Sequence, residues 1–318
     1  MKRHQQVLAA ILIVQIILSA VLLWPRQTTG GTGQAIFPDL KVEDIVALTI
    51  TDDQENAIKM QKEGDTWGLV EADAYPVREA TLTTLLEKLP KLTNASLVAQ
   101  TAASHKQLQV AEDDFVRRLE IAMRDGKTYT LYLGSAPRYT ATHFRVDGQT
   151  ETYMTAEMTT WEVNATVSSW IDTTYCQVDQ AELTEVIIQN ANGTFTLVKS
   201  GEEWQLADLT ADETPSPGKT SGVVGRVSRI AMAHPLGKTA KPEYGLDAPL
   251  ATITLKTADA TYTMLIGAQT DDTSYAAKYS GSDYYAAVPS YSVKTLTENV
   301  RADFLETPVE PTAPPTAP

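Results

Sequence analysis

The chain has 318 residues, 43% of them hydrophobic, which is enough for two domains of ordinary size with packed cores. Its formal net charge of −14 argues against nucleic acid as a partner, because neutralising phosphates needs clustered Lys and Arg. The same acidity argues against adhesion to an anionic lipid surface.

An apolar segment, Val7–Trp24, follows the basic start Lys2-Arg3-His4 and is interrupted only by Gln15 and Ser19. As a helix it would span about 27 Å, close to the hydrocarbon thickness of a bilayer. A cleaved signal peptide is the alternative, but its apolar region would be shorter and would end at a small-residue site. We interpret residues 1–26 as a cytoplasmic start and membrane anchor, with the bulk of the chain outside the cytoplasm by the positive-inside rule.

Residues 27–36 are rich in Thr and Gly and are interpreted as a flexible linker. Residues 307–318, rich in Pro, Thr and Ala, are expected to form a disordered tail. Between them, residues 37–172 and 173–306 are interpreted as two tandem copies of one unit, called repeat A and repeat B. The predicted fold class is α+β, a transmembrane helix followed by two units that each have a mainly antiparallel sheet and one packed helix.

The repetition is clearest in a Gly-x-x-Trp-x-Leu pattern that follows two predicted strands in each unit. Its positions are Gly64, Trp67 and Leu69 in repeat A and Gly201, Trp204 and Leu206 in repeat B. One such match would be weak, but seven or more predicted elements occur in one order in both units. Trp67 and Trp204 are expected to anchor each sheet against its helix.

Repeat A alternates apolar and polar residues in short runs, which is typical of half-buried strands. Its predicted elements are strands at Leu48–Ile50, Ile58–Met60 and Trp67–Leu69, a helix over Arg78–Leu89, strands at Leu119–Ile121, Tyr129–Leu133, Phe144–Val146 and Thr152–Met154, and a helical closing segment over Ala156–Asp172. Gly134 closes the strand that ends at Leu133.

Repeat B has the same order, with a stronger hairpin signal at Asn192-Gly193. Its predicted elements are strands at Val186–Ile188, Phe195–Leu197 and Trp204–Leu206, a helix carrying Val223, Val227 and Ile230, strands at Ile253–Leu255, Tyr262–Ile266 and Tyr275–Tyr279, and a helical closing segment over Ser292–Leu305. Gly267 closes its strand as Gly134 does in repeat A.

Four tyrosines form the candidate binding surface. Tyr275 and Tyr279 share one face of a predicted strand, and Tyr284 and Tyr285 lie on its neighbour. Such a cluster suits stacking on a sugar or contact with a protein partner. The alternative is a sheet face covered by the helix of the same unit.

Signals of catalysis and metal binding are weak. The four histidines, His4, His105, His143 and His234, show no ligand spacing, and Asp52-Asp53 and Asp271-Asp272 are interpreted as solvated turns. We expect no metal, no cofactor and no catalytic residue, although paired carboxylates of a hydrolase leave no local signature. Cys176 is the only cysteine and is interpreted as a small buried hydrophobe.

The chain resembles the DUF4340 family of bacterial proteins. The resemblance rests on Gly201-x-x-Trp204-x-Leu206, on Tyr244-Gly245-Leu246-Asp247-Ala248-Pro249 and on the strand ending Leu265-Ile266-Gly267. Repeat A departs from it at Leu108-Gln109-Val110-Ala111-Glu112. The resemblance implies a membrane-anchored protein with its family domain outside the cytoplasm. The family has no agreed activity, and some relatives look like accessory parts of ABC-type export or gliding machinery.

The favoured function is a non-catalytic, extracytoplasmic accessory or binding module of a bacterial envelope assembly. The expected partners are the membrane and an envelope protein, such as a component of an ABC-type transporter, and not nucleic acid. Two alternatives stay open, an envelope hydrolase acting on polysaccharide or peptidoglycan and a carbohydrate-binding protein.

Overall fold

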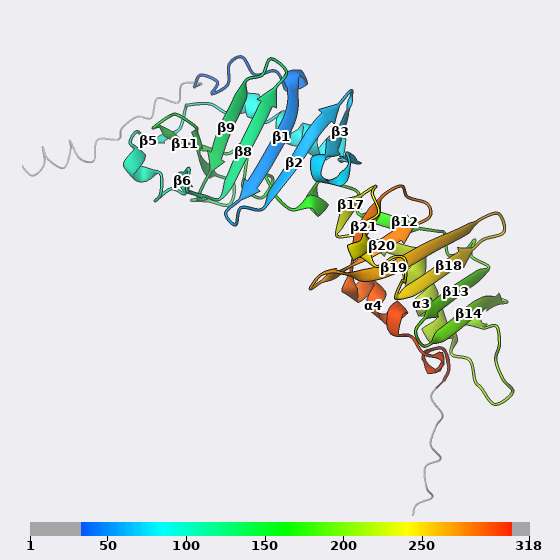
Figure 1. Ribbon diagram of the computed structural model, residues 1–318. Coiled ribbons are helices and arrows are strands. Elements are labelled where there is room, and N and C mark those ends of the chain that lie inside the picture. Colours follow the sequence, from blue (N-terminus) through cyan, green and yellow to red (C-terminus); the bar gives the residue numbers. More distant parts are fainter. Residues whose placement is uncertain (1–32, 307–318) are drawn as a thin grey trace, which may run out of the picture.

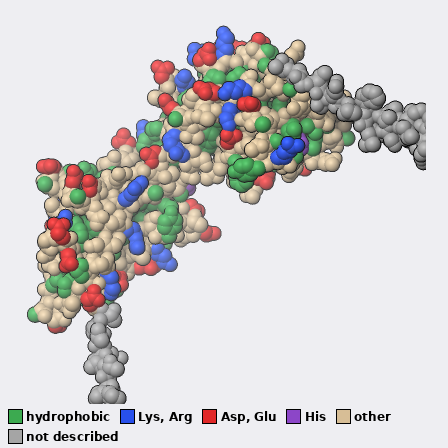
Figure 2. Space-filling model, turned by 180° about the vertical axis from the view of Figure 1, so that it is seen from behind, with side chains coloured by type: hydrophobic (Ala, Val, Ile, Leu, Met, Phe, Trp, Pro, Cys, Tyr) green, Lys and Arg blue, Asp and Glu red, His purple; other side chains and the backbone are tan. Residues whose placement is uncertain are grey.

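The computed structural model describes residues 33–306. The expected membrane anchor, most of the expected linker and the C-terminal tail lie outside these residues. Within them, no helix is both long and apolar enough to cross a bilayer. Two large sheets lie end to end in an elongated molecule (Figure 1). On the face seen in Figure 2, acidic and basic side chains are interspersed over both halves.

The first half holds an antiparallel sheet of nine strands. In sheet order they are β4 (Tyr75–Pro76), β3 (Thr66–Leu69), β2 (Ala57–Glu63), β1 (Ile45–Asp52), β8 (Arg117–Met123), β9 (Thr128–Leu133), β10 (Thr142–Val146), β11 (Thr152–Thr155) and β5 (Leu97–Ala99). A separate short pair, β6 (Val110–Ala111) and β7 (Asp114–Phe115), lies beside it.

The second half holds an antiparallel sheet of eight strands. In sheet order they are β15 (Glu203–Leu206), β14 (Gly193–Ser200), β13 (Glu185–Asn190), β18 (Ala251–Lys256), β19 (Thr261–Asp271), β20 (Ser274–Tyr279), β21 (Tyr285–Pro289) and β17 (His234–Gly237). A short pair, β12 (Thr174–Gln177) and β16 (Arg229–Ala231), completes this half.

Helices are few in the described part of the chain, which confirms the expectation of mainly antiparallel sheets with a minor helical content. The α-helices are α2 (Glu79–Leu86), α3 (Pro217–Ser228) and α4 (Ser290–Glu298). The 3-10 helices are η1 (Val42–Asp44), η2 (Val70–Ala72), η3 (Leu89–Lys91), η4 (Ala102–Ser104), η5 (Val167–Ser169), η6 (Pro242–Tyr244) and η7 (Arg301–Phe304).

Near the centre of each sheet lies a strand, β1 or β13, whose apolar residues on one face are buried while its other residues are mostly partly exposed. Ile50 in β1 and Ile188 in β13 each have an exposed fraction of 0%. The cross-strand rows through them are Ile58–Ile50–Leu119 and Phe195–Ile188–Ile253. Alternation places such a row on one face of its sheet, and that face packs against the helices.

Helix α2 packs on the first sheet through Leu82, Leu85 and Leu86. It is shorter than the predicted Arg78–Leu89 helix, because Pro90 cannot continue the hydrogen-bond ladder and Leu89 already belongs to η3.

Helix α3 differs from the prediction in its buried side. Val224 and Val227 face the core, whereas Val223 is only half-buried. Ile230 is not helical at all. It lies in β16 and pairs with Cys176, because the helix ends at Ser228 and the chain becomes extended. A β-branched residue fits such a strand better than a last helical turn.

The two closing segments are unlike each other, which corrects the expectation of two helices. The segment after β21 forms α4, with Val293 and Leu296 buried. Residues 156–172 are irregular apart from η5. The buried Met158 and Val163 in this segment are not spaced as on one helix face, and Asn164 accepts a hydrogen bond from the N–H of Thr166, which favours a turn.

Of the two glycines expected to close strands, here called the closing glycines, Gly134 directly follows β9, but Gly267 lies inside β19, which continues to Asp271. Both positions exclude a side chain for the same steric reason. A Cβ on Gly134 would lie 2.1 Å from the carbonyl oxygen of Leu108, and one on Gly267 would lie 2.0 Å from that of Tyr244. In each half, a loop from before the sheet's central hairpin therefore crosses directly over the glycine. Only a residue without a side chain permits this approach.

The folded part begins within the expected linker. The N–H of Gln34 donates to the Asn94 side chain, Ala35 bridges Thr93, and the N–H of Ile36 donates to the Leu92 carbonyl. Residues 34–36 are thus held against the first half, and the boundary at residue 37 is too late.

Candidate functional site

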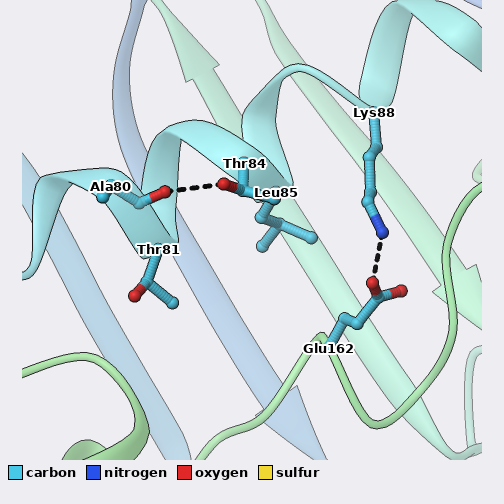
Figure 3. A pocket seen from close by; sticks show the side chains of 6 residues that line it. All are labelled: Ala80, Thr81, Thr84, Leu85, Lys88 and Glu162. Atoms are coloured by element: carbon cyan, nitrogen blue, oxygen red, sulfur yellow. Dashed lines mark hydrogen bonds and ion pairs between the residues drawn. The ribbon is translucent and has the colours of Figure 1, made fainter.

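A cavity of about 440 Å³ opens beside α2 in the first half (Figure 3). We call it the α2 groove. Ala80, Thr81, Thr84 and Leu85 line its helix wall, together with Lys88 just beyond the helix; Glu162 lines it from the irregular segment after β11. An ion pair between Lys88 and Glu162 joins the helix to that segment.

The ionised form of Glu162 is stabilised by its neighbours. Burial opposes its ionisation, but the Lys88 ammonium and the backbone N–H and hydroxyl of Thr159 outweigh it and lower the pKa of Glu162. The groove therefore has a fixed, paired charge beside small and apolar side chains. This is the mixture that anchors an apolar ligand and sets its orientation.

Short side chains keep the groove open. The Thr84 hydroxyl donates to the Ala80 carbonyl at 2.7 Å, within its own helix (Figure 3). The buried residues of α2 and α3 have the same spacing, with Leu82 and Leu85 in the places of Val224 and Val227. In this alignment Thr84 corresponds to Arg226. Arg226 reaches the Thr295 hydroxyl on α4. In the second half α4 lies beside α3 at this contact, whereas in the first half the cavity lies beside α2.

Trp161 stands next to Glu162 in the chain and is 76% exposed. Large aromatic side chains at that exposure are common in interaction surfaces. Neither the groove nor Trp161 was predicted from the sequence. The available signal was a tryptophan in a mostly polar segment with no counterpart in repeat B.

A second feature is the junction between the halves, where η2 and β4 meet β17 and the start of β21 (Figure 1). The backbone N–H of Lys238 donates to the Asp73 carboxylate at 2.6 Å. The Tyr284 hydroxyl donates to the carbonyls of Asp73 and Ala74, both at 3.3 Å. Its ring meets that of Tyr75 edge-on, with centroids 4.7 Å apart.

Beside this junction lies a cavity of about 270 Å³ with walls from both halves. Its polar lining includes Glu71, His234, Lys241 and Tyr244. Burial lowers the pKa of His234, with the Asp271 charge opposing the shift, so the imidazole is neutral at neutral pH. The Tyr244 hydroxyl donates to the Leu236 carbonyl at 3.1 Å and fixes the ring at the cavity wall.

The four candidate tyrosines do not form one surface, which corrects that expectation. Tyr279 is buried and Tyr275 packs on the same core. Tyr285 pairs with Lys278 and lies on the opposite face of the sheet, while Tyr284 reaches the first half. Alternation along β20 and β21 separates side chains that are close in sequence.

The expected structural tryptophans differ in burial. Trp204 is 2% exposed and lies in β15 beneath α3, whereas Trp67 is half-buried at the edge of the core. Cys176 is fully buried, as expected, and burial raises the pKa of its thiol to about 11. His143 and Ser135 are hydrogen-bonded at 3.0 Å through Nδ1 and Oγ, and burial lowers the pKa of His143.

Among residues 33–306, no three His, Cys, Asp or Glu side chains come together as a potential metal site. A family model described as a domain of unknown function, DUF4340, matches residues 67–233, more than half of the chain. No curated protein and no solved structure matches the chain. The match covers the first half from β3 onward, the junction segment and the second half as far as β16.

Proposed function

Since the chain belongs to the DUF4340 family, whose domain has no known function, we propose that it is a non-catalytic accessory module of a bacterial envelope assembly. The apolar run Val7–Trp24 and the basic residues before it support a single membrane anchor with the folded part outside the cytoplasm. The family resemblance favours an ABC-type transporter as the assembly.

The observation that carries the binding role is the α2 groove. It combines an apolar wall with a fixed Lys88–Glu162 pair, and the exposed Trp161 precedes Glu162 in the chain. We propose that a short amphipathic helix of a partner protein occupies it, as α4 lies beside α3 in the second half. Such a helix would present small apolar residues to Ala80 and Thr84 and a polar group to Lys88.

The comparison between the halves rests on a proposed duplication. Both sheets have their strands in the same order, apart from the additional edge strand β4 of the first sheet. At the loop over each closing glycine, Gln109 has φ 55° and Gly245 has φ 62°. This left-handed backbone conformation is uncommon for a residue other than glycine, yet Gln109 has it. Its presence at matching places in both halves supports descent from one unit. An experimental structure in which Trp67 and Trp204 fail to superpose would remove this support.

The groove is tested by photo-crosslinking in intact cells. A photoreactive amino acid replaces Thr84, which lines the groove, or its exposed helical neighbour Thr83 as the matched control. We expect one membrane-associated protein to be captured from position 84 and not from 83, with the yield reduced in a Trp161→Ala background. Equal capture from both positions would contradict a groove-specific partner.

The non-catalytic role has its own test. The purified full-length chain is incubated with peptidoglycan, common glycans and peptides, and no turnover is expected. Hydrolysis that disappears when one Asp or Glu is changed to its amide, with folding intact, would replace this proposal by an envelope hydrolase.

Orientation is tested separately, by adding protease to intact spheroplasts. We expect both halves to be digested while the anchor stays in the membrane. Complete protection would place the folded part on the cytoplasmic side.

A further inference from the structure

A hollow of about 340 Å³ lies on the outer face of the second sheet. Its floor is the cross-strand row Leu265–Lys278–Tyr285. The next row, Ile266–Ala277–Ala286, is part of the hydrophobic core, so the floor row faces the other way. The wall is the loop around η6, including Lys241, Leu246 and Asp247.

The first half closes the corresponding place with its own side chain. Arg145 in β10 pairs with Tyr132 in β9, as Lys278 pairs with Leu265. The Arg145 side chain is buried, its Nε donates to the Val110 carbonyl at 2.7 Å, and its guanidinium carbon lies 4.4 Å from the centre of the Tyr132 ring. An arginine thus ties the overlying loop to the sheet and fills the space beneath it.

In the second half the corresponding residue is Lys278, whose side chain is shorter than that of Arg145 and does not contact the overlying loop in the same way. The Lys278 ammonium donates to the Ser282 carbonyl and lies 5.2 Å from the centre of the Tyr285 ring. The loop carrying Leu246 stays over the sheet, because Gly267 lets the Tyr244 carbonyl approach, but the space that Arg145 fills in the first half is open.

The lining of this hollow carries charges of both signs, including two ammonium groups that can pair with an acidic ligand. Two ammonium groups, Lys241 and Lys278, face one lining carboxylate, Asp247, and Asp283 lies close enough to act on Lys278. Burial lowers the pKa of Lys278, with Asp283 opposing it, so an incoming anion would stabilise its charged form. Leu246 and Leu265 supply an apolar surface beside the charges.

We propose that this hollow binds a carboxylate attached to an apolar body, with the carboxylate paired to Lys278 and Lys241 and the body against Leu246 and Leu265. The source is either a free organic acid or the C-terminus of a short apolar peptide, since both offer this chemistry. The site lies in the other half from the α2 groove, so it stands or fails independently of the function proposed above.

The test is calorimetric titration of the full-length chain in mild detergent. The probes are N-acetyl-leucine, its amide and acetyl-Ala-Ala-Leu with a free C-terminus. We expect the free acids to bind and the amide to bind about tenfold more weakly or not at all, because it lacks the charge-assisted contact. Binding of both acids indicates any such carboxylate, and binding of the tripeptide alone indicates a peptide C-terminus.

Three variants locate the site. Lys278→Met and the exposed Lys241→Met should each weaken binding of the acid by about tenfold, which is the effect of losing one charged partner. Lys278→Arg should weaken it too, because the longer side chain can fill the space as Arg145 does. Lys199→Met, an exposed lysine of β14, is the matched control and should leave binding unchanged.

Melting curves show whether each variant is folded. If Lys278→Met does not fold, Lys241→Met decides the question alone. Equal binding of acid and amide, or wild-type affinity in the folded lysine variants, would overturn the site.

Discussion

At the scale of single residues, the two closing glycines carry a specific prediction. Gly267→Ala and Gly134→Ala place a Cβ about 2 Å from a backbone carbonyl oxygen that cannot move without its loop. Overpacking of this kind costs on the order of 1–3 kcal/mol or more. Gly222→Ala in α3 is the control, because its Cβ meets nothing within 4 Å and alanine is the better helix former. Urea unfolding should show a loss for the first two and no loss for the third.

Cys176 gives the second residue-scale prediction. Burial raises the pKa of its thiol to about 11, so the reactive thiolate is scarce near neutral pH and reagents cannot reach the sulfur. The native chain should therefore react very slowly with a thiol reagent at about pH 8, and stoichiometrically in denaturant. Fast labelling of the folded protein would show that β12 and β16 separate readily from the core.

At the scale of elements, the central strands were predictable because their alternation has one physical cause, a sheet with one buried face. Leu48 and Ile50, like Val186 and Ile188, lie where that pattern places them. The closing segment of the first half was not predictable, because a mostly polar run leaves helix and loop nearly equal in propensity. The prediction of a tyrosine surface was wrong for another reason. The alternation of a strand shows that Tyr279 and its neighbours point to opposite faces, but it does not show which face of the sheet is covered by a helix.

The same limit applies to the site. The α2 groove depends on Thr84 lying at the cavity wall and on an irregular segment over residues 156–172, and both depend on tertiary packing. The sequence did single out Gly134 and Gly267, the two glycines at which the structure shows a close backbone approach. The sequence did not show how the two halves differ in the side chains and loops that surround these glycines.

The two tryptophans near the ends of the sheets allow an element-scale prediction. Trp204 in β15 is almost fully buried beneath α3, so Trp204→Ala should cost about 3–5 kcal/mol of unfolding free energy. Trp67 is half-buried at the matching place in β3, and Trp67→Ala should cost clearly less. Chemical denaturation of the two variants measures the difference. Equal losses would mean that Trp67 is held more tightly than its exposure indicates.

At the scale of the whole molecule, the halves are joined by one chain segment and by a junction of apolar, polar and aromatic contacts, and one hydrophobic cluster runs through both halves. Domains of one chain are expected to move relative to each other unless the interface between them is large and hydrophobic. Tyr284 contributes to the junction through its hydroxyl, which donates to two carbonyls of the first half, and through its edge-on contact with Tyr75.

We therefore expect Tyr284→Ala to loosen the junction without unfolding either half. Spin labels on cysteines introduced at the exposed Lys59 and Lys199, one in each half, report the distance between the halves. The distance distribution should broaden in Tyr284→Ala, whereas Tyr291→Ala, which removes a tyrosine that is 80% exposed, should leave it unchanged. Each half should keep its circular dichroism, because the side chain is removed from the contact between the sheets and not from either core. An unchanged distribution in Tyr284→Ala would mean that the connecting segment around Asp172, whose carbonyl accepts a hydrogen bond from Tyr75, is enough to hold the halves in place.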